Sequence, residues 1–337
     1  VYCWGYNGYG GLGNGTTVDS ATPVPVTGIT NAVAITAGSA SCAVLSTHHM
    51  QCWGNNANGQ LGNGKNVGPY RCQTGGTNCI STTPTAVSGI SNAVSVAAGN
   101  AHTCARLSTH GIKCWGSRIW GQLGDGMTVL NNTGTCGAYA SCSSTPVAVH
   151  GISNATGLTT GGDFSCARLS TGKLDCWGLN DEGQLGVGSV TGPKTCNSGT
   201  TSTTARPCSR VPVAVAESSS SSAVAAGTWH ACALLVSGGL DCWGLNAYGE
   251  LGNGTFNGQT CGGYGVCNPT PGPVSGLSGV TSMSGGAVHS CALLSTGSLD
   301  CWGTNYYGQL GNGTDSGPET CETYGCNTEP EPVIGLP

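Results

Sequence analysis

The chain has 337 residues, of which 59 are Gly and 21 are Cys, whereas Asp, Glu, Lys and Arg together make up only 7% and the formal net charge is −5. About a quarter of the residues of an ordinary globular domain are charged, so this surface must be built from Ser, Thr, Asn and Gly. The ten Lys and Arg residues are scattered and cannot form the basic stripe that a nucleic-acid partner requires. Because 38% of the residues are apolar, disorder is also excluded.

The cysteine content indicates the compartment. A reducing cytosol keeps thiols from pairing, so a chain with 21 cysteines is expected in an oxidising setting, which means extracellular or at the cell surface. No apolar stretch of 18 residues occurs, so no membrane span is expected. No signal peptide is visible at Val1, and we expect the numbered chain to begin after processing or within a longer protein.

The tripeptide Cys-Trp-Gly occurs six times and marks an internal repeat. Each copy is followed by a glycine-rich turn with a Gly-x-Leu-Gly core, so the whole unit recurs along the chain. The tripeptides begin at Cys3, Cys52, Cys114, Cys176, Cys242 and Cys301, and the turns lie at 10–13, 59–62, 121–124, 183–186, 249–252 and 308–311.

Each unit is predicted to contain four short strands. A strand of small residues that ends in Gly comes first, as in 32–38 and 93–99. A strand with a central Cys follows, as in 102–107 and 289–294, and then come the Cys-Trp-Gly strand and, after a loop of variable length, a Pro-Val strand such as 145–149. Short runs rich in Val, Ala, Leu and Thr between Gly, Asn and Ser are typical of strands, and no run has a sustained helical period.

Repeated four-stranded units with Gly at close-packed positions and one Trp each are typical of β-propeller blades, which cover one another's faces. With six copies of Cys-Trp-Gly and the Gly-Gln-Leu-Gly type of turn, the units resemble the repeats of the regulator of chromosome condensation family over essentially the whole chain. The resemblance implies a β-propeller, which typically has seven blades in this family. Relatives of this kind include a nuclear nucleotide-exchange factor for a small GTPase and a secreted bacterial inhibitor of β-lactamase, which implies a function exerted through a propeller face.

We therefore predict an all-β fold in which residues 1–337 form a single repeat domain, a β-propeller of four-stranded blades. Residues 1–28 supply an N-terminal half blade with the last two strands of the unit only. Five complete blades are predicted at 31–89, 92–151, 154–216, 222–275 and 279–335. Closure of the ring then needs a missing hairpin, supplied by an upstream segment or by a second chain.

Register along the hairpin pairs ten of the 21 cysteines, and the variable loops carry ten more. In every complete blade the Cys of the second strand lies ten residues before the Cys of Cys-Trp-Gly, and a tight hairpin brings such residues opposite each other. The predicted hairpin disulfides are Cys42–Cys52, Cys104–Cys114, Cys166–Cys176, Cys232–Cys242 and Cys291–Cys301, and the predicted loop disulfides are Cys72–Cys79, Cys136–Cys142, Cys196–Cys208, Cys261–Cys267 and Cys321–Cys326. Cys3 is left unpaired in the chain, and its partner would belong to the missing hairpin.

Neither a zinc site nor a phosphate-binding site is expected. The loop cysteines have at least four residues between them and no His at matching offsets, so zinc is not expected. Residues 8–13 satisfy Gly-x-Gly-x-x-Gly, and residues 59–65 match a P-loop up to its Ser or Thr, where Asn66 stands. Both motifs need a following helix to hold phosphate, and neither segment has one.

Three histidines share one repeat position. At the equivalent places of His102, His230 and His289 stand Ala40 and Phe164, so a packed structural imidazole is expected there. No Ser, His and Asp set or Cys and His pair stands out, and bridged cysteines cannot act as nucleophiles. We expect no catalytic, cofactor-binding or metal-binding residue, and hence no enzymatic activity.

Aromatic residues near the glycine-rich turns are predicted to form patches on a propeller face, where partners usually dock. Two of them are tryptophans outside the repeat, and the full set is Trp120, Trp229, Tyr6, Tyr9, Tyr248, Tyr306 and Tyr307. Candidate glycosylation sites, which suit a secreted protein, are the sequons at Asn14, Asn131, Asn154, Asn253 and Asn312.

Two functional hypotheses follow. The first is an extracellular structural or adhesive repeat protein, a segment or subunit of a larger surface assembly or filament, whose partners are copies of itself or other surface proteins. Low charge, dense disulfides and the half blade favour it. The alternative is a secreted propeller module, inhibitor-like or receptor-like, that binds a protein or a glycan. Neither hypothesis involves nucleic acid or a cofactor, and the sequence leaves both open.

Overall fold

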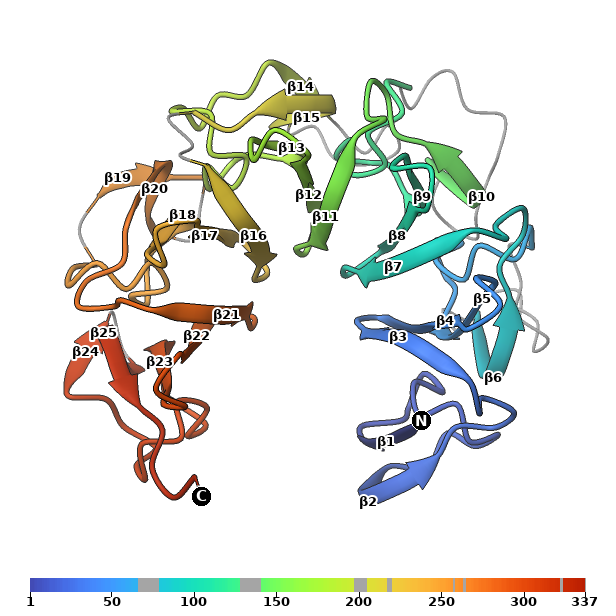
Figure 1. Ribbon diagram of the computed structural model, residues 1–337, viewed down its shortest axis with the longest axis horizontal. Coiled ribbons are helices and arrows are strands. Elements are labelled where there is room, and N and C mark those ends of the chain that lie inside the picture. Colours follow the sequence, from blue (N-terminus) through green and yellow to red (C-terminus); the bar gives the residue numbers. More distant parts are fainter. Residues whose placement is uncertain are drawn as a thin grey trace.

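The structure, a computed structural model, describes eight stretches of the chain. These are residues 1–65, 79–127, 141–196, 205–216, 220–256, 258–262, 265–321 and 324–336. Within them the regular elements are all strands, arranged in six antiparallel sheets that follow one another in an arc around a common centre (Figure 1). The two ends of the arc carry the N- and C-termini and lie apart in Figure 1. The described residues include no helix that could cross a membrane.

The N-terminal sheet has two strands, and the next two sheets have four each. They are the half blade, β1 (Tyr2–Gly5) and β2 (Ser20–Pro25), the first blade, β3 (Ala32–Ala37), β4 (Ala40–Leu45), β5 (Met50–Asn55) and β6 (Ile80–Ala86), and the second blade, β7 (Ala93–Ala98), β8 (His102–Leu107), β9 (Ile112–Ser117) and β10 (Cys142–Ala148). Neighbouring strands in each sheet are consecutive in the chain, as in a simple meander.

The three remaining sheets have five strands, one more than the sequence predicts. They are the third blade, β11 (Ala155–Thr160), β12 (Phe164–Leu169), β13 (Leu174–Leu179), β14 (Lys194–Cys196) and β15 (Arg206–Ala214), the fourth, β16 (Ser221–Ala226), β17 (His230–Leu235), β18 (Leu240–Leu245), β19 (Gln259–Cys261) and β20 (Gly265–Pro273), and the fifth, β21 (Val280–Gly285), β22 (His289–Leu294), β23 (Leu299–Thr304), β24 (Glu319–Cys321) and β25 (Tyr324–Pro332). The extra strands β14, β19 and β24 lie in the variable loops and pair with the outer strand of their own blade.

The hydrophobic cores lie between blades. In one cluster Trp115 of the second blade packs with Met50 and Leu61 of the first, and in another Trp177 of the third packs with Leu123 of the second. Two further clusters repeat the pattern with Trp243 and Trp302. All of these tryptophans are at most 1% exposed. Since a small sheet cannot bury both faces alone, each blade depends on its neighbours for a core.

The Gly of Cys-Trp-Gly marks a bulge in the third strand. The register with the outer strand shifts between Cys52 and Gly54, and likewise between Cys176 and Gly178. These glycines have φ of 100° and 110°, in the left-handed region that other residues rarely adopt. A Cβ on Gly178 would also lie 2.5 Å from Asp163 O. Both constraints explain why the tripeptide ends in Gly.

Candidate functional site

The Trp of each complete blade hydrogen-bonds the turn of the preceding blade. Trp115 Nε1 donates to Gln60 O at 2.8 Å, and Trp177 Nε1 donates to Gln122 O at 3.0 Å. The indole lies so close to the turn that a Cβ on Gly62 would stand 2.6 Å from Trp115 Nε1. The same bond is made by Trp53, Trp243 and Trp302. The repeat therefore holds the turns of successive blades next to one another.

An aromatic pocket of about 350 Å³ lies between the turns of the fourth and fifth blades. This volume is at the small end of the range of ligand pockets in proteins. The pocket is lined by Trp229, Leu245, Tyr248, Val288, Thr304, Tyr306, Tyr307, Gln309 and Tyr324. None of these side chains is charged at neutral pH. By contrast, a cavity of similar volume at the centre of the arc is lined by Gly, Ala, Ser, Thr and Asn.

The tyrosines of the pocket contact one another mainly edge to face. The ring of Tyr306 lies 4.7 Å from that of Tyr307 at 80°, and 4.9 Å from that of Tyr324 at 76°. Tyr324 in turn lies 6.0 Å from Tyr248 at 58°. Such geometry is favourable for aromatic pairs and orders the rings. Tyr306 and Tyr307 are 52% and 84% exposed.

The pocket contains only part of the aromatic set predicted from the sequence. Four members come together in it, namely Trp229, Tyr248, Tyr306 and Tyr307. Tyr6 and Tyr9 instead form a separate pair in the half blade, with ring centroids 6.0 Å apart. Trp120 lies under the guanidinium of Arg206, 5.5 Å from it. The residue that sequence reasoning missed is Tyr324, two positions before Cys326. The equivalent positions hold Arg206 and Gly265, so no repeated aromatic pointed to it.

A charged cluster lies between the second and third blades, at the repeat positions that line the aromatic pocket between the fourth and fifth. Arg206 forms an ion pair with Asp181, whose side chain is 3% exposed, and Gln122 Nε2 donates to Asp163 Oδ1 at 3.1 Å. Burial raises the pKa of Asp163 to about 6, with Arg206 opposing this shift and Asp181 adding to it. Burial also raises the pKa of Asp181, although Arg206 acts against it. No sequence motif predicted this charged cluster.

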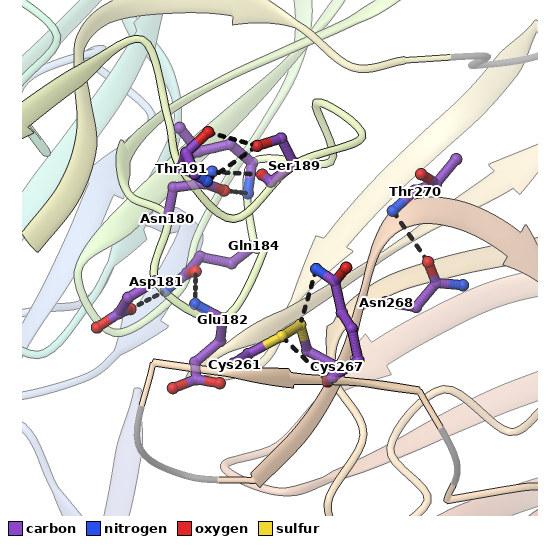
Figure 2. The surroundings of a disulfide bond; sticks show 12 residues. Asn180, Asp181, Glu182, Gln184, Ser189, Thr191, Cys261, Cys267, Asn268 and Thr270 are labelled. Carbon is purple, nitrogen blue, oxygen red and sulfur yellow. Dashed lines mark hydrogen bonds between the residues drawn. A yellow bond between two sulfur atoms is a disulfide. The ribbon is translucent and has the colours of Figure 1, made fainter.

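A loop of the fourth blade contacts this cluster, and Figure 2 shows the Cys261–Cys267 disulfide of that blade beside the turn that carries Asp181 and Glu182. Gly262 N donates to Asp181 O at 3.0 Å, and a Cβ on Gly262 would lie 2.7 Å from the same oxygen. Within the turn, Gln184 Oε1 accepts from Glu182 N at 2.8 Å and Gln184 Nε2 donates to Asp181 Oδ1 at 3.3 Å. The contact explains why these acids are buried.

Two of the repeated histidines are buried between blades. His102 Nε2 lies 2.8 Å from Ser165 Oγ, and His230 Nε2 lies 2.8 Å from Ser290 Oγ. Burial lowers the pKa of both imidazoles to about 3, so they are neutral at physiological pH. His289 is less buried, and its pKa is lowered for the same reason. These contacts join neighbouring blades, and they assemble no acid, base and nucleophile set among the described residues.

The cysteines lie opposite each other in the hairpins. Cys42 and Cys52 are register partners in β4 and β5, with Cα atoms 4.1 Å apart and a disulfide between them. The other disulfides whose two cysteines are both described are Cys104–Cys114, Cys166–Cys176, Cys196–Cys208, Cys232–Cys242, Cys261–Cys267, Cys291–Cys301 and Cys321–Cys326. Cys79 and Cys142 are also disulfide-bonded. Their predicted partners, Cys72 and Cys136, lie outside the described residues.

Cys3 is a free thiol in the half blade, partly buried, and burial raises its pKa. In the described part of the chain the group that comes nearest to a metal-ligand set is Glu319, Cys321 and Cys326. Its two sulfurs share a disulfide, so they are not available as thiolate ligands.

The sequons lie in turns and connections of the described residues, except Asn131, which falls outside them. Asn14 Oδ1 accepts from Thr16 N at 3.1 Å, and Asn253 and Asn312 make the same contact with the Thr of their sequons. Asn154 Nδ2 donates to Ser170 Oγ at 3.5 Å. All four asparagines are partly exposed. Residues 8–13 and 59–65, the two phosphate-like motifs, form turns, and no helix follows residues 8–13.

These features define the class of protein: a disulfide-bridged β-propeller whose neighbouring blades are joined by the same Trp-to-turn contact. The chain belongs to the family of the regulator of chromosome condensation (RCC1) repeat. One model of this repeat matches residues 1–45, 52–106, 171–234 and 237–293, and a second matches 156–184, 222–250 and 280–309. The family resemblance seen in the sequence is thereby confirmed.

Among its relatives is the secretion-regulating guanine nucleotide exchange factor of Mus musculus, 27% identical over 255 residues that cover 72% of this chain and 49% of the relative. The ultraviolet-B receptor UVR8 of Arabidopsis thaliana is 27% identical over 224 residues, 65% of this chain and 43% of the receptor. The chain thus spans about half the length of these relatives. The solved structure of Prp20p from Saccharomyces cerevisiae matches 99% of this chain and 72% of its own, with a TM-score of 0.76 and 22% identity, which shows the shared fold.

Proposed function

We propose that this chain is a non-enzymatic interaction module of an extracellular or cell-surface protein, and that it holds a protein partner at the aromatic pocket. The observation that carries the proposal is the pocket itself, in which Trp229 and four tyrosines gather at adjacent turns. Trp and Tyr are the residues that most often dominate the energetics of protein interfaces.

The relatives support a protein partner. The structure of yeast Prp20p is reported together with its binding to Gsp1p and histones, and the mouse relative is named a guanine nucleotide exchange factor. For this chain we infer only that a propeller of the same family binds protein. The extracellular setting is supported by the disulfides in every complete blade, since such bonds persist in oxidising compartments.

The proposal is tested by capture from the secreted and cell-surface fractions of the source organism. The oxidised chain is immobilised, and the retained proteins are identified by mass spectrometry for the wild type, Tyr306→Ala and Tyr9→Ala. Tyr9 occupies the turn position of Tyr307 but lies in the half blade. We expect Tyr306→Ala to lose the retained proteins and Tyr9→Ala to keep them. Equal retention by all three chains would place the binding surface elsewhere and defeat the proposal.

A second candidate function is structural or adhesive assembly of copies of the chain. The observations in its favour are the low charge of the chain and its dense disulfides. A head-to-tail contact would bring Trp4 of one copy to the Gln309 turn of the next. Sedimentation equilibrium tests this: assembly that grows with concentration and is abolished by Trp4→Ala supports it, and a wild-type monomer throughout rejects it.

A further inference from the structure

We propose that copies of this chain bind one another head to tail, with the outer hairpin of the fifth blade of one copy docked on the outer hairpin of the third blade of the next. The proposal rests on the assembly of copies named above as the second candidate function, and it specifies a contact for it. The outer hairpins lie on the side of the arc away from its centre and consist of β14 and β15 in the third blade, β19 and β20 in the fourth and β24 and β25 in the fifth (Figure 1).

Positive and negative charge are separated along the chain. All ten Lys and Arg residues lie within residues 65–210, together with five Asp and Glu, so this stretch has a formal charge of +5. Residues 211–337 contain nine Asp and Glu and no Lys or Arg, which gives −9. Such a separation makes the basic region of one copy attractive to the acidic region of another.

One position of the outer hairpin shows this separation directly. The outermost strands read Lys-Thr-Cys in β14, Gln-Thr-Cys in β19 and Glu-Thr-Cys in β24. The first residue of this strand is therefore positive in the third blade, neutral in the fourth and negative in the fifth. Because the fourth blade lies between the other two, the opposite charges of one copy are a whole blade apart (Figure 1). They can meet only when the hairpins of two copies come together.

The third-blade hairpin carries two cations without an acidic partner. Lys194 is exposed and Arg210 is partly exposed, and the ion pairs within the described residues involve neither of them. Arg210 Nη2 donates to Thr195 O at 3.2 Å, which holds the guanidinium beside the outermost strand. A guanidinium has five N–H donors, so this bond leaves others for a carboxylate of a second copy.

The fifth-blade hairpin offers carboxylates at the matching place. Glu319 Oε2 accepts from Thr328 N at 3.1 Å, so the Glu319 side chain lies against the hairpin next to Glu329. Both glutamates are exposed, and the sequence contains no Lys or Arg after Arg210. Two carboxylates on one hairpin thus face a lysine and an arginine on the other, which suits charge-assisted hydrogen bonds.

The neighbouring blades leave this edge uncovered. The first two residues of β14 and of β19 are exposed although another blade follows each of them in the arc. The exposure of the same residues of β24 is therefore a property of the outer hairpin, whatever follows the fifth blade. Each outermost strand pairs with one strand only, and such an edge presents N–H and C=O groups that a second chain can approach.

A second copy is the partner that these features fit. It brings the complementary charge at the same repeat position of the same kind of hairpin, and each copy has one basic and one acidic hairpin to offer. A contact between two different surfaces of identical chains generates rings or open filaments. Exposed ion pairs contribute little individually and are screened by salt, so we expect a weak association that depends on ionic strength.

The test is sedimentation equilibrium of the oxidised full chain in low salt and in about 0.5 M salt. We expect the average mass of the wild type to rise with concentration in low salt only, and Lys194→Glu to weaken the association about fivefold. Lys65→Glu, which reverses an exposed cation of the first blade, should leave it unchanged.

Two double variants make the test specific for the contact. Lys194→Glu with Arg210→Glu leaves two acidic hairpins on one chain, and Glu319→Lys with Glu329→Lys leaves two basic ones. Each double variant should be monomeric alone, whereas an equal mixture of the two should associate about as tightly as the wild type. The mixture also shows that both variants are folded, because only folded hairpins restore the contact.

Three outcomes overturn the proposal. Association that both double variants retain, or that persists unchanged in high salt, removes the charged contact but leaves the assembly of copies standing, to be judged by Trp4→Ala. A mixture of two folded double variants that stays monomeric, with folding checked by far-UV circular dichroism, also removes the contact. A wild type that is monomeric at every concentration in low salt overturns both the contact and the second candidate function, whereas the protein partner proposed for the aromatic pocket is unaffected.

Discussion

The charged cluster of the third blade and the aromatic pocket of the fifth are built at the same positions of one repeat. The sequence aligns Asp163 with Val288, Asp181 with Tyr306, Glu182 with Tyr307 and Arg206 with Tyr324. The acids are buried, with Glu182 0% exposed, whereas Tyr307 is 84% exposed. The contact of the Trp with the turn of the preceding blade is the same in both regions, whereas the turn that carries Asp181 is also covered by the fourth blade. The difference teaches that the acids depend on the fourth blade, which covers their turn, so substitutions in the charged cluster should affect stability more than substitutions of the tyrosines.

The largest expected effect comes from the position shared by Arg206 and Tyr324. Arg206→Ala leaves the buried carboxylates of Asp181 and Asp163 without their cation, and we expect a loss of about 3–5 kcal/mol in the free energy of unfolding at pH 7. Tyr324→Ala removes a ring that is 40% exposed and should cost about 1 kcal/mol or less. Denaturant unfolding with the disulfides intact measures both.

The pH dependence of the Arg206→Ala variant provides the internal control. Because the cost arises from uncompensated carboxylates, much of it should be recovered when they are protonated near pH 4. If Arg206→Ala and Tyr324→Ala cost the same at pH 7, or if the loss for Arg206→Ala is independent of pH, the two regions do not differ in the way the structure indicates.

The two buried histidines should behave alike in both regions. His102 lies beside the charged cluster and His230 beside the aromatic pocket, and each has a folded-state pKa of about 3 against an ordinary value of 6.5. The stability that a depressed pKa contributes is present above pH 6.5 and is lost as the pH falls toward 3. Each residue should add a slope of about 1.4 kcal/mol per pH unit over this window.

His102→Phe is a matched substitution, because Phe164 stands at the same position in the third blade and is 0% exposed. We expect the unfolding free energy of this variant to fall less steeply with decreasing pH, by the slope that one histidine contributes. His230→Phe should reduce the slope by the same amount. Unfolding free energies at successive pH values from 7 to 3 measure both effects. A pH profile unchanged in both variants would mean that the imidazoles take up protons in the folded state.

Asp163 should affect the pH dependence of the unfolding free energy in the opposite direction to the histidines, and this effect belongs to the charged cluster only. Its pKa is raised from 3.8 to about 6, so the stability linked to its protonation is full below pH 3.8 and is lost as the pH rises through 6. Asp163→Asn keeps an oxygen for Gln122 Nε2 and should remain uncharged at all pH values. We expect it to stabilise the chain by roughly 3 kcal/mol at pH 7 and not at pH 3.5. An equal effect at both pH values would show that the carboxyl is not perturbed.

The repeat and the hairpin register were accessible to sequence reasoning because they depend on local spacing. Cys42 and Cys52 lie ten residues apart on one hairpin, and the tight turn between them leaves a single register. The third, fourth and fifth blades have extra strands that the sequence did not predict, because a three-residue strand such as Lys194–Cys196 lies in a variable loop without an alternating pattern.

The candidate site was only partly predictable, for a physical reason. Trp229 and Tyr306 attracted attention as aromatic residues near turns, but they meet only because adjacent blades stack at the Trp-to-turn contact. Tyr324, the first residue of β25, lines the pocket only because the fold places that strand beside it. Asp163 and Asp181 are likewise close enough to interact only in the folded chain. Contacts between blades depend on the angle at which sheets pack, and no spacing within one unit encodes that angle.

The smallest effect should be equal in the two regions, because it concerns the contact that they share. Trp177→Phe removes the hydrogen bond to Gln122 O beside the charged cluster, and Trp302→Phe removes the bond to Glu250 O beside the pocket. A serine hydroxyl still donates to each of these oxygens, 3.3 Å away in both cases. We therefore expect each variant to lose about 1–2 kcal/mol of unfolding free energy.

Trp4→Phe is the control for this pair, since Trp4 is 63% exposed and should change the unfolding free energy by less than about 0.5 kcal/mol. If Trp177→Phe proves far more costly than Trp302→Phe, the junctions between blades are not equivalent, and the charged cluster stabilises its junction through the tryptophan as well as through its ion pair. If the two variants lose the same unfolding free energy, the Trp-to-turn contact contributes equally at both junctions. The acids, arginine and tyrosines around it then account for the differences between blades.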